Sequence, residues 1–503
     1  MPGPPPHESP RGPLRPLRPL RRATAIALVR PITTERITKV PQSSRYNLPY
    51  VWSVALVAAM GGLLFGYDWV VIGGAKPFFE KFFQLDREAL SGWANSCALL
   101  GCLLGSLAVG GLSDKFGRKK LLLASALLFA GSSVLTGWAP TFAWFVVWRI
   151  TGGVAIGMAS NLSPMYIAEM APAELRGRLV ALNQLTIVLG VLGAQTVNWL
   201  IAQPVPAGAA AEMIGQSWNG QLGWRWMFTA VAGPSTLFFL GALFVPESPR
   251  WLIKRGWVDR AARILGRIGG PEYAARGCRE IQETLARDEI GTVRFADLCE
   301  PKMLRILMVG CLLAVLQQWS GINVIFNYAE EIFLQAGYGI SDIMFKIVVT
   351  GLVMLLFTLI AIATVDRFGR RGLMLTGCAG IATFHTLIGL AYCWQLKGLI
   401  VVIPVLATIA CYSFSLAPVT WVLISEIFPN RIRGAAVSVA VSALWIACFI
   451  LTYTFPWLNA HLGAAMTFWL YAAICGAGFV FILLRVPETK GKSLEQIEKE
   501  LVD

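Results

Sequence analysis

Asp114-Lys-Phe-Gly-Arg118-Lys119 is the stretch that decides the fold, because it recurs in the second half of the chain as Asp366-Arg-Phe-Gly-Arg370-Arg371. Two other motifs recur in the same order. A Glu followed seven residues later by Arg-Gly occurs at Glu169 and Glu426, and a Pro-Glu pair begins at Pro246 and Pro487. Charged motifs that repeat between apolar stretches indicate one long internal duplication. Such a duplication is typical of membrane transporters built from two related halves, with the binding site between them.

The composition is that of a membrane protein. Of 503 residues, 56% are hydrophobic and 14% are charged, whereas soluble domains carry about 25% charged residues. Apolar runs of about 20 residues can cross the bilayer as helices, which satisfy their own backbone groups. We therefore predict an all-α protein with twelve transmembrane helices in two six-helix bundles, at roughly 50–75, 92–113, 120–138, 142–163, 180–203, 226–245, 304–334, 343–365, 371–394, 398–425, 433–454 and 463–485.

The positive charge also indicates a membrane protein. The net charge of +14 could suggest a nucleic acid partner, but most of the 43 Lys and Arg residues fall on one side of the twelve predicted spans. This asymmetry follows the positive-inside rule. We therefore expect the protein to interact with the lipid bilayer and not with nucleic acid. We also expect a multi-pass membrane protein with both termini in the cytoplasm.

Five segments follow from this pattern. We predict a disordered, Pro- and Arg-rich cytoplasmic tail, a bundle, a charged linker of cytoplasmic helices, a second bundle and a cytoplasmic tail, at 1–47, 48–245, 246–303, 304–486 and 487–503. The ten cysteines include no C-x-x-C pair and there are only three His residues. We therefore expect no metal site and no cofactor, and the absence of a nucleotide loop or nucleophile elbow argues against an enzyme.

Helix-breaking residues are concentrated in the first, seventh and tenth predicted spans. They are the glycines between Gly61 and Gly74, the pair Ser320-Gly321, and Pro404 with Pro418. Breaks at membrane depth occur where freed backbone lines a cavity. The alternative for most of the glycines is close packing of helices through small residues.

The motifs together resemble those of the major facilitator superfamily, the sugar porter family within it, and its bacterial xylose–proton symporter group in particular. The resemblance runs from about residue 50 to residue 500. It rests on the two repeated loops, the two Glu-x6-Arg-Gly motifs, Pro246-Glu-Ser-Pro-Arg-Trp-Leu252, Gln317-Gln-Trp-Ser-Gly-Ile-Asn323 and Pro487-Glu-Thr-Lys-Gly491. It implies alternating access between two bundles and a sugar as substrate.

The loop motifs place opposite charges at the cytoplasmic ends of helices in each half. Pairs of this kind can join helices while the cytoplasmic side is closed and separate when it opens. The alternative is that they are anchors in solvated loops, where single pairs contribute little. The predicted gate consists of Asp114, Arg118, Glu169, Arg176, Asp366, Arg370, Glu426 and Arg433, to which the resemblance adds Glu247, Arg250 and Glu488.

A substrate site is indicated by uncharged polar and aromatic residues within apolar spans. Amides donate to and accept from hydroxyl groups, and an indole ring covers C–H groups, which suits a neutral sugar or polyol. By resemblance, positions that contact sugar are Gln184, Gln317, Gln318, Asn323 and Trp421; we add Gln195, Asn327 and Trp445. The alternative, hydrogen bonding between helices, is strongest for Gln195 and Asn327.

The predicted pocket departs from the family pattern in its C-terminal half. Met354, Leu444 and Cys448 stand where the family commonly has amides, and Asn327 replaces a usual Tyr. A site that leaves a substrate hydroxyl without a partner loses binding energy. The identity of the sugar therefore does not follow from the family, and a deoxysugar or a polyol remains an alternative substrate.

Asp68 and Arg149 are ionisable residues within the first and fourth predicted spans. Such groups are costly in a bilayer and are functional candidates. By resemblance, proton-coupled sugar porters carry Asp at the place of Asp68. We predict proton symport with Asp68 as proton site and Arg149 as its modulator; the alternative is a fixed structural ion pair.

Two other functions stay open. A passive sugar facilitator would move substrate without protons, and an organic-acid–proton symporter of the same superfamily would need a cation such as Arg149 for the carboxylate. By resemblance we expect a bacterial inner membrane protein that functions as a monomer.

Overall fold

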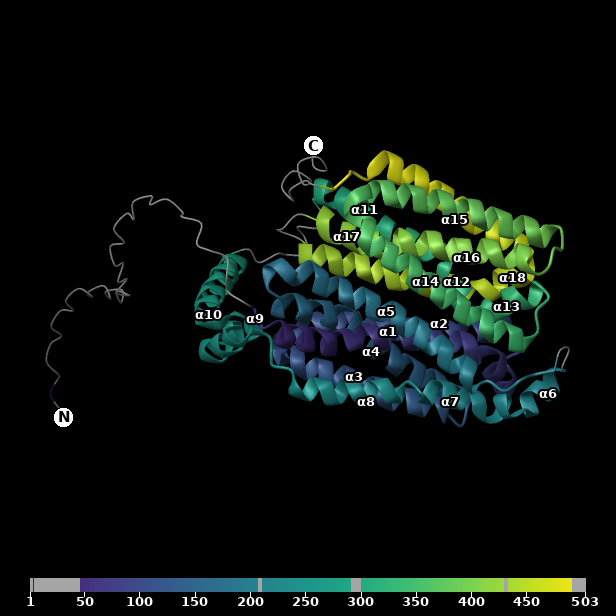
Figure 1. Cartoon of the computed structure of the whole chain (residues 1–503), viewed down its shortest axis with the longest axis horizontal. Coiled ribbons are helices and arrows are strands. Elements are labelled where there is room, and N and C mark those ends of the chain that lie inside the picture. Colours follow the sequence, from purple (N-terminus) through teal and green to yellow (C-terminus); the bar gives the residue numbers. More distant parts are fainter. Residues whose placement is uncertain (1–2, 4–45, 207–209, 291–299, 429–432, 491–503) are drawn as a thin grey trace. The chain divides into compact units, whose positions relative to one another are not determined.

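The computed structural model describes residues 3, 46–206, 210–290, 300–428 and 433–490 (Figure 1). The predicted tails at 1–47 and 487–503 lie almost wholly outside these residues. The described part of the chain contains helices and no β-strand. This confirms the predicted all-α fold class.

The first half of the chain forms the helices from α1 to α8. Their bounds are α1 Leu48–Phe83, α2 Glu88–Phe116, α3 Arg118–Gly137, α4 Phe142–Met170, α5 Ala173–Ile201, α6 Ala211–Gln216, the π-helix η1 Asn219–Gly223, α7 Trp224–Thr229 and α8 Ala232–Phe244. Two linker helices follow, α9 Pro249–Lys254 and α10 Val258–Ile290. In Figure 1 both lie at the left end of the membrane helices. We call this the linker end, and the opposite end, near α6 and α13, the far end.

The second half forms the helices from α11 to α18. Their bounds are α11 Pro301–Trp319, α12 Ile322–Asn327, α13 Ala329–Gln335, α14 Ile340–Phe368, α15 Arg370–Cys393, α16 Leu399–Phe414, α17 Leu416–Ile427 and α18 Arg433–Arg485. The two halves meet where α2 packs against α18 and α5 packs against α14. The far-end part of α1 also contacts α12 and α13.

Eleven helical segments of the described residues are long and apolar enough to cross a membrane. The last of them, Ala435–Arg485, has 51 residues, which is more than twice the length that one crossing needs. Its helix α18 is interrupted at Gly463, whose φ of 77° lies in the left-handed region that favours glycine. The two parts of α18 therefore supply two crossings, which gives the predicted twelve.

The break predicted in the seventh span is present, because Gly321 has a φ of 84° and separates α11 from α12. The tenth span is also interrupted, but at Ser415, which separates α16 from α17. Pro418 lies in the first turn of α17, whereas Pro404 lies inside α16 and does not interrupt it. The break predicted in the first span is wrong, because α1 is one continuous helix of 36 residues. Its glycines instead allow close packing: a Cβ on Gly66 would lie 1.9 Å from the carbonyl oxygen of Ile187 in α5.

Candidate substrate cavity and proton site

A cavity of about 750 Å³ lies between the two halves. It has contributions from α1, α4 and α5 on one side and from α11, α12, α14, α16, α17 and α18 on the other. At the linker end it extends to Glu174, Arg178 and Arg370. A cavity of this size accommodates a small solute together with water.

Six of the eight predicted substrate residues line this cavity, namely Gln184, Gln317, Gln318, Asn323, Trp421 and Trp445. The break at Gly321 brings the amides of α11 and α12 together. Asn323 Nδ2 donates to Gln318 Oε1 at 2.5 Å, and Gln318 Nε2 donates to Gln317 Oε1 at 3.2 Å. Gln317 Nε2 lies 3.2 Å from the carbonyl oxygen of Leu416, at the start of α17. The two interrupted spans therefore form one connected polar wall.

The break itself is held by a side chain from another helix. Ring nitrogen Nε2 of His385 in α15 lies 2.8 Å from the carbonyl oxygen of Ser320, which the interruption leaves outside the regular helical pattern. His385 is completely buried. His385 is therefore a core residue that supports the interruption between α11 and α12.

An aromatic wall faces the amides from the other half and from α18. The ring of Trp445 lies 6.1 Å from the ring of Phe65 and 5.9 Å from that of Trp69. The indole Nε1 of Trp445 is buried and has no hydrogen-bond partner among the described residues. Sequence reasoning missed Phe65, Trp69 and the cavity-lining Tyr412. Phe65 and Trp69 are four residues apart and therefore share one face of α1, next to Gly66. This spacing could have indicated that both rings line the cavity.

Gln195 and Asn327 do not line the cavity. Gln195 Nε2 donates to Thr350 Oγ1 at 3.2 Å and so connects α5 to α14. Asn327 is 3% exposed at the end of α12, beside Gly73 of α1. For both residues this geometry corrects the predicted substrate contact and favours the alternative, packing and hydrogen bonding between helices.

Three of the four departures from the family pattern are at the cavity. Met354 and Leu444 line it. Cys448 lies beside it and accepts a hydrogen bond from Asn323 Nδ2 at 3.3 Å. The wall formed by α14 and α18 is therefore apolar, in contrast to the amide wall of α11 and α12.

Asp68 and Arg149 form a buried ion pair within the first half. Arg149 Nη1 lies 3.1 Å from Asp68 Oδ1, and the two residues are 4% and 3% exposed. The guanidinium of Arg149 also lies over the ring of Phe228, 5.4 Å from its centroid. Asp68 Oδ2 has no hydrogen-bond partner among the described residues. The pair does not line the cavity, but Asp68 is adjacent in sequence to Trp69, which does.

The repeated motifs form similar ion pairs in the two halves. Arg118 contacts Glu169 with two nitrogens, at 3.0 Å and 2.9 Å, and Asp114 at 3.3 Å. Asp114 also pairs with Lys254 of α9 at 2.8 Å. In the second half the corresponding pair is Arg370 with Glu426, at 3.5 Å. The pairs of Arg118 and Arg370 each join helices of a single half, and the pair of Asp114 with Lys254 joins the first half to the linker helix α9.

The repeated Pro-Glu motifs also have matching geometry. Glu247 Oε1 accepts from the backbone N–H groups of Arg118 at 2.8 Å and Lys119 at 3.1 Å. Glu488 accepts from those of Arg370 at 2.9 Å and Arg371 at 3.1 Å. Partial burial opposes ionisation of Glu488, but these backbone donors outweigh it and lower the pKa of its carboxyl group.

The remaining gate residues are less informative. Arg176 is exposed at the start of α5, and Arg250 lies in the first turn of α9. The side chains of Asp366 and Arg433 lie outside the described part of the structure.

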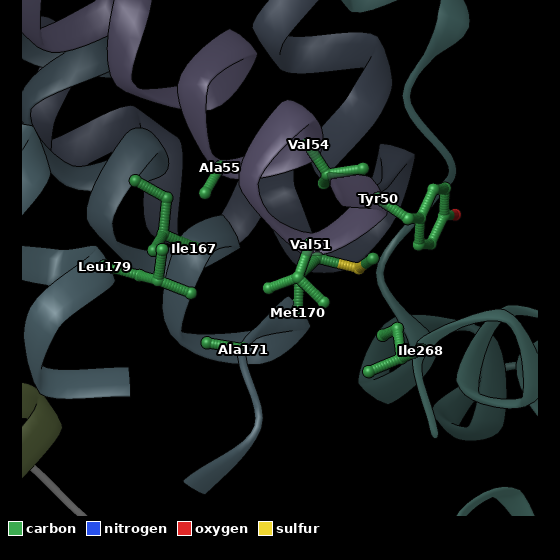
Figure 2. Close-up of a pocket in the computed structure, with 9 residues that line it drawn as sticks. All are labelled: Tyr50, Val51, Val54, Ala55, Ile167, Met170, Ala171, Leu179 and Ile268. Atoms are coloured by element: carbon green, nitrogen blue, oxygen red, sulfur yellow. The ribbon is translucent and has the colours of Figure 1, made fainter. Parts of the chain in front are cut away.

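A second, much smaller cavity lies at the linker end, where α1, α4 and α5 approach α10 (Figure 2). Its volume is about 10 Å³, enough for about one water molecule. The side chains around it, including Val51, Ile167, Leu179 and Ile268, are mostly apolar. It cannot hold a sugar.

One charged cluster at the far end was missed by sequence reasoning. Lys76 of α1 lies 2.8 Å from Glu331 of α13, which connects the two halves directly. The signal was present in the sequence, because Lys76, Glu80, Glu330 and Glu331 all fall within or beside predicted apolar spans. Ionisable residues in such positions are functional candidates.

Comparison with known proteins agrees with this architecture. Residues 54–501 match the family model described as sugar (and other) transporter. The chain is 37% identical to the D-xylose-proton symporter of Escherichia coli (strain K12) over 492 residues, covering 91% of this chain and 96% of that protein. It is also 37% identical to the arabinose-proton symporter of Bacillus subtilis over 468 residues, covering 93% and 98%.

A solved structure has the same fold. The inward-open conformation of the xylose transporter from Escherichia coli superposes with a TM-score of 0.77 at 36% identity, covering 90% of this chain and 99% of that one. These similarities confirm the family resemblance inferred from the motifs.

Proposed function

This chain belongs to the sugar transporter family, and on that premise we propose that it carries a neutral polyhydroxylated solute together with a proton across a bacterial inner membrane. It is an integral membrane protein with many crossings and functions by alternating access of the cavity between its halves. Relatives named as sugar–proton symporters support this proposal.

The observation that carries the substrate class is the amide wall of the cavity. Gln317, Gln318 and Asn323 present donors and acceptors that can exchange their mutual hydrogen bonds for bonds to sugar hydroxyls. The aromatic wall of Phe65, Trp69 and Trp445 can cover the apolar face of a sugar ring. Among the described residues, the charged side chains that line the cavity, Glu174, Arg178 and Arg370, lie at its linker end.

The apolar wall restricts the kind of sugar. Met354 and Leu444 offer no hydrogen-bonding group to a hydroxyl that points toward α14 or α18. Burying such a hydroxyl without a partner costs about 1–3 kcal/mol. We therefore propose that the substrate has fewer hydroxyls on this face than a typical hexose, as in a deoxysugar or a reduced polyol.

The organic-acid alternative is less well supported. A carboxylate substrate held at the amide wall needs a cation beside that wall. Arg149 is buried against Asp68 outside the cavity lining, and Arg178 and Arg370 line the cavity at its linker end. The unpartnered Oδ2 of Asp68 supports symport, because a carboxyl oxygen without a donor can hold a proton at little steric cost.

The linker end is proposed to be cytoplasmic. It carries the basic α9 and α10 region, as the positive-inside rule requires. The cavity extends toward this end, and the ion pairs named there stay within single halves. The structure then corresponds to an inward-facing state, in which the cavity is open toward the cytoplasm while the ion pairs of Arg118 and Arg370 remain formed within their own halves.

The substrate assignment can be tested with purified protein. A thermal-shift screen over pentoses, hexoses, deoxysugars, polyols and sugar acids should identify ligands that raise the unfolding temperature. Gln318→Ala and Asn323→Ala should each weaken binding of the best ligand by about tenfold, because each loses one or two hydrogen bonds. Gln195→Ala is the matched control, since Gln195 lies outside the cavity. Unchanged binding in both cavity variants, or stabilisation by acids alone, would refute the assignment.

A further inference from the structure

The far end holds four charged side chains in one cluster, which we call the far-end quartet: Lys76, Glu80, Glu330 and Glu331. Lys76 Nζ lies 2.8 Å from Glu331, 3.0 Å from Glu80 and 3.8 Å from Glu330. Lys76 is 2% exposed, and its ammonium lies 5.5 Å from the centroid of the Tyr328 ring. The quartet joins α1 of the first half to α13 of the second half.

The charges of the quartet do not balance. Three carboxylates face one ammonium, and the neighbouring contacts add little positive charge. Ser91 of α2 donates to Glu80 at 2.5 Å, while the other nearby cation, Lys81, is exposed. Glu331 Oε2 has no hydrogen-bond partner among the described residues. Excess charge in a buried cluster costs several kcal/mol, and a carboxyl group avoids this cost by taking up a proton.

Glu330 is the carboxyl group that best accommodates the proton. It is the farthest of the three from Lys76 and therefore gains least from the ammonium. Burial raises the pKa of Glu330 to about 7, against an ordinary value of 4.5, although Lys76 opposes the shift. Glu80 and Glu331 lie closer to Lys76, at 3.0 Å and 2.8 Å, and therefore gain more from its ammonium.

We propose that the far-end quartet is a second proton-binding site, in which Glu330 holds a proton only while the two halves are closed at the far end. The proposal depends on the alternating access proposed above. When the far end opens, α13 leaves α1, Lys76 retains Glu80 on its own helix, and Glu330 becomes hydrated. The proton then returns to the side from which it came. This proton is therefore distinct from one that Asp68 would carry across the membrane.

The sign of the resulting pH effect follows from the two states. The closed state binds the proton more tightly, so its added stability is fully present below pH 4.5 and is lost as the pH rises through about 7. Between these values the ratio of closed to open far ends should rise by up to about tenfold for each unit of acidification. If the far end is periplasmic, external acid would promote the inward-facing state, in the direction that proton-driven uptake requires.

The test measures the far-end distance directly. Spin labels would be placed by Ala89→Cys and Gln335→Cys, two exposed positions in opposite halves, in a chain with Cys393→Ser and Asp68→Asn. Asp68→Asn removes the other predicted proton site. In reconstituted protein, the closed fraction from pulsed electron spin resonance should fall as the pH rises from 5.5 to 7.5, with a change of about twentyfold in the closed-to-open ratio.

Substitutions in the quartet then assign the effect. Glu330→Gln resembles the protonated acid, so the far end should stay closed and the pH dependence should disappear. Lys76→Met should favour the open far end at pH 7.5, because three carboxyl groups lose their cation. Glu88→Gln, an exposed acid on α2, is the matched control and should keep the pH dependence. A pH dependence that survives Glu330→Gln, or one absent from the parent chain, would overturn the proposal.

The proposed function and the proposal for the quartet can be refuted independently of each other. If the parent chain exchanges no sugar or polyol in vesicles, the substrate assignment fails, whereas the distance measurement still reports on the quartet. Size-exclusion profiles of all variants show whether a changed distance reflects misfolding.

Discussion

Substituting Gly73 by Ala should open the far end of the protein. Gly73 lies on α1 opposite Phe326 of α12, and a Cβ at this position would lie 2.3 Å from the carbonyl oxygen of Phe326. A backbone oxygen cannot rotate away as a side chain can, so the two helices must separate by about 1 Å, at a typical overpacking cost of about 1–3 kcal/mol.

This cost falls on one state only. In the outward-facing state the halves separate at the far end, and the contact between Gly73 and Phe326 is lost. The equilibrium should therefore shift toward the outward-facing state by about 5- to 150-fold, which is the range that 1–3 kcal/mol produces.

Hydrogen–deuterium exchange measured by mass spectrometry can detect this shift without labels. In Gly73→Ala, the amides of α12 and of the far-end turns of α1 should exchange faster, and those at the linker ends of α4 and α5 should exchange more slowly. Gly131→Ala is the matched control, because nothing lies within 4 Å of a Cβ at Gly131 in α3. Identical exchange in Gly73→Ala and the parent chain would show that this contact does not close the far end.

Three further predictions concern the proton site, the linker end and the apolar wall. Asp68→Asn should leave sugar exchange between vesicles and medium intact but remove accumulation, which for one proton per sugar reaches about hundredfold over two pH units; accumulation in the variant would contradict coupling through Asp68. Glu488→Gln should lower the unfolding temperature at pH 7 by a few degrees. This difference should vanish as the pH falls through the lowered pKa of Glu488, because the parent protein then loses its charged acceptor as well. A difference in unfolding temperature that persists in acid would exclude the carboxylate as its cause. Met354→Asn should improve binding of fully hydroxylated sugars over deoxysugars by about fivefold in competition assays, since it adds one hydrogen bond to the apolar wall; an unchanged preference would place that wall away from the sugar.

Local sequence rules predicted the helices and the interruption of the seventh span because the relevant signals are local, whereas the sugar-contacting positions were assigned by resemblance to the family. Spans follow from apolar length, and the interruption at Gly321 follows from a Ser-Gly pair in an apolar run. Gln317, Gln318 and Asn323 converge because the interruption lies between them. These relations hold within about seven residues and need no knowledge of the other helices.

Relations across the two halves could not be predicted in the same way. The glycines of α1 are compatible with a broken helix and with a closely packed one. The close approach of α5 accounts for them as packing positions in a continuous helix. Gln195 is an amide within an apolar span, which is typical of a ligand-binding residue. Its side chain instead donates to Thr350 of the opposite half, a partner that the sequence does not indicate. Lys76 was visible as a charge in an apolar span, yet its partners Glu330 and Glu331 depend on how the halves meet.

The location of the ion pairs indicates which contacts can set the free-energy difference between the inward-facing and outward-facing states. Arg118 with Glu169, and Arg370 with Glu426, each join helices of one half, so a movement of one half against the other leaves them intact. They can keep each half rigid, but in this state they do not hold the halves together. The contacts that must change at the far end include the tight approach at Gly73, the quartet around Lys76 and the hydrogen bonds between Val205 and Ser341. A carrier needs two states within a few kcal/mol of each other, because a substrate bound with millimolar affinity supplies only about 4 kcal/mol. A quartet that gains or loses one proton near neutral pH can adjust this balance, whereas a fully neutralised ion pair of fixed charge cannot.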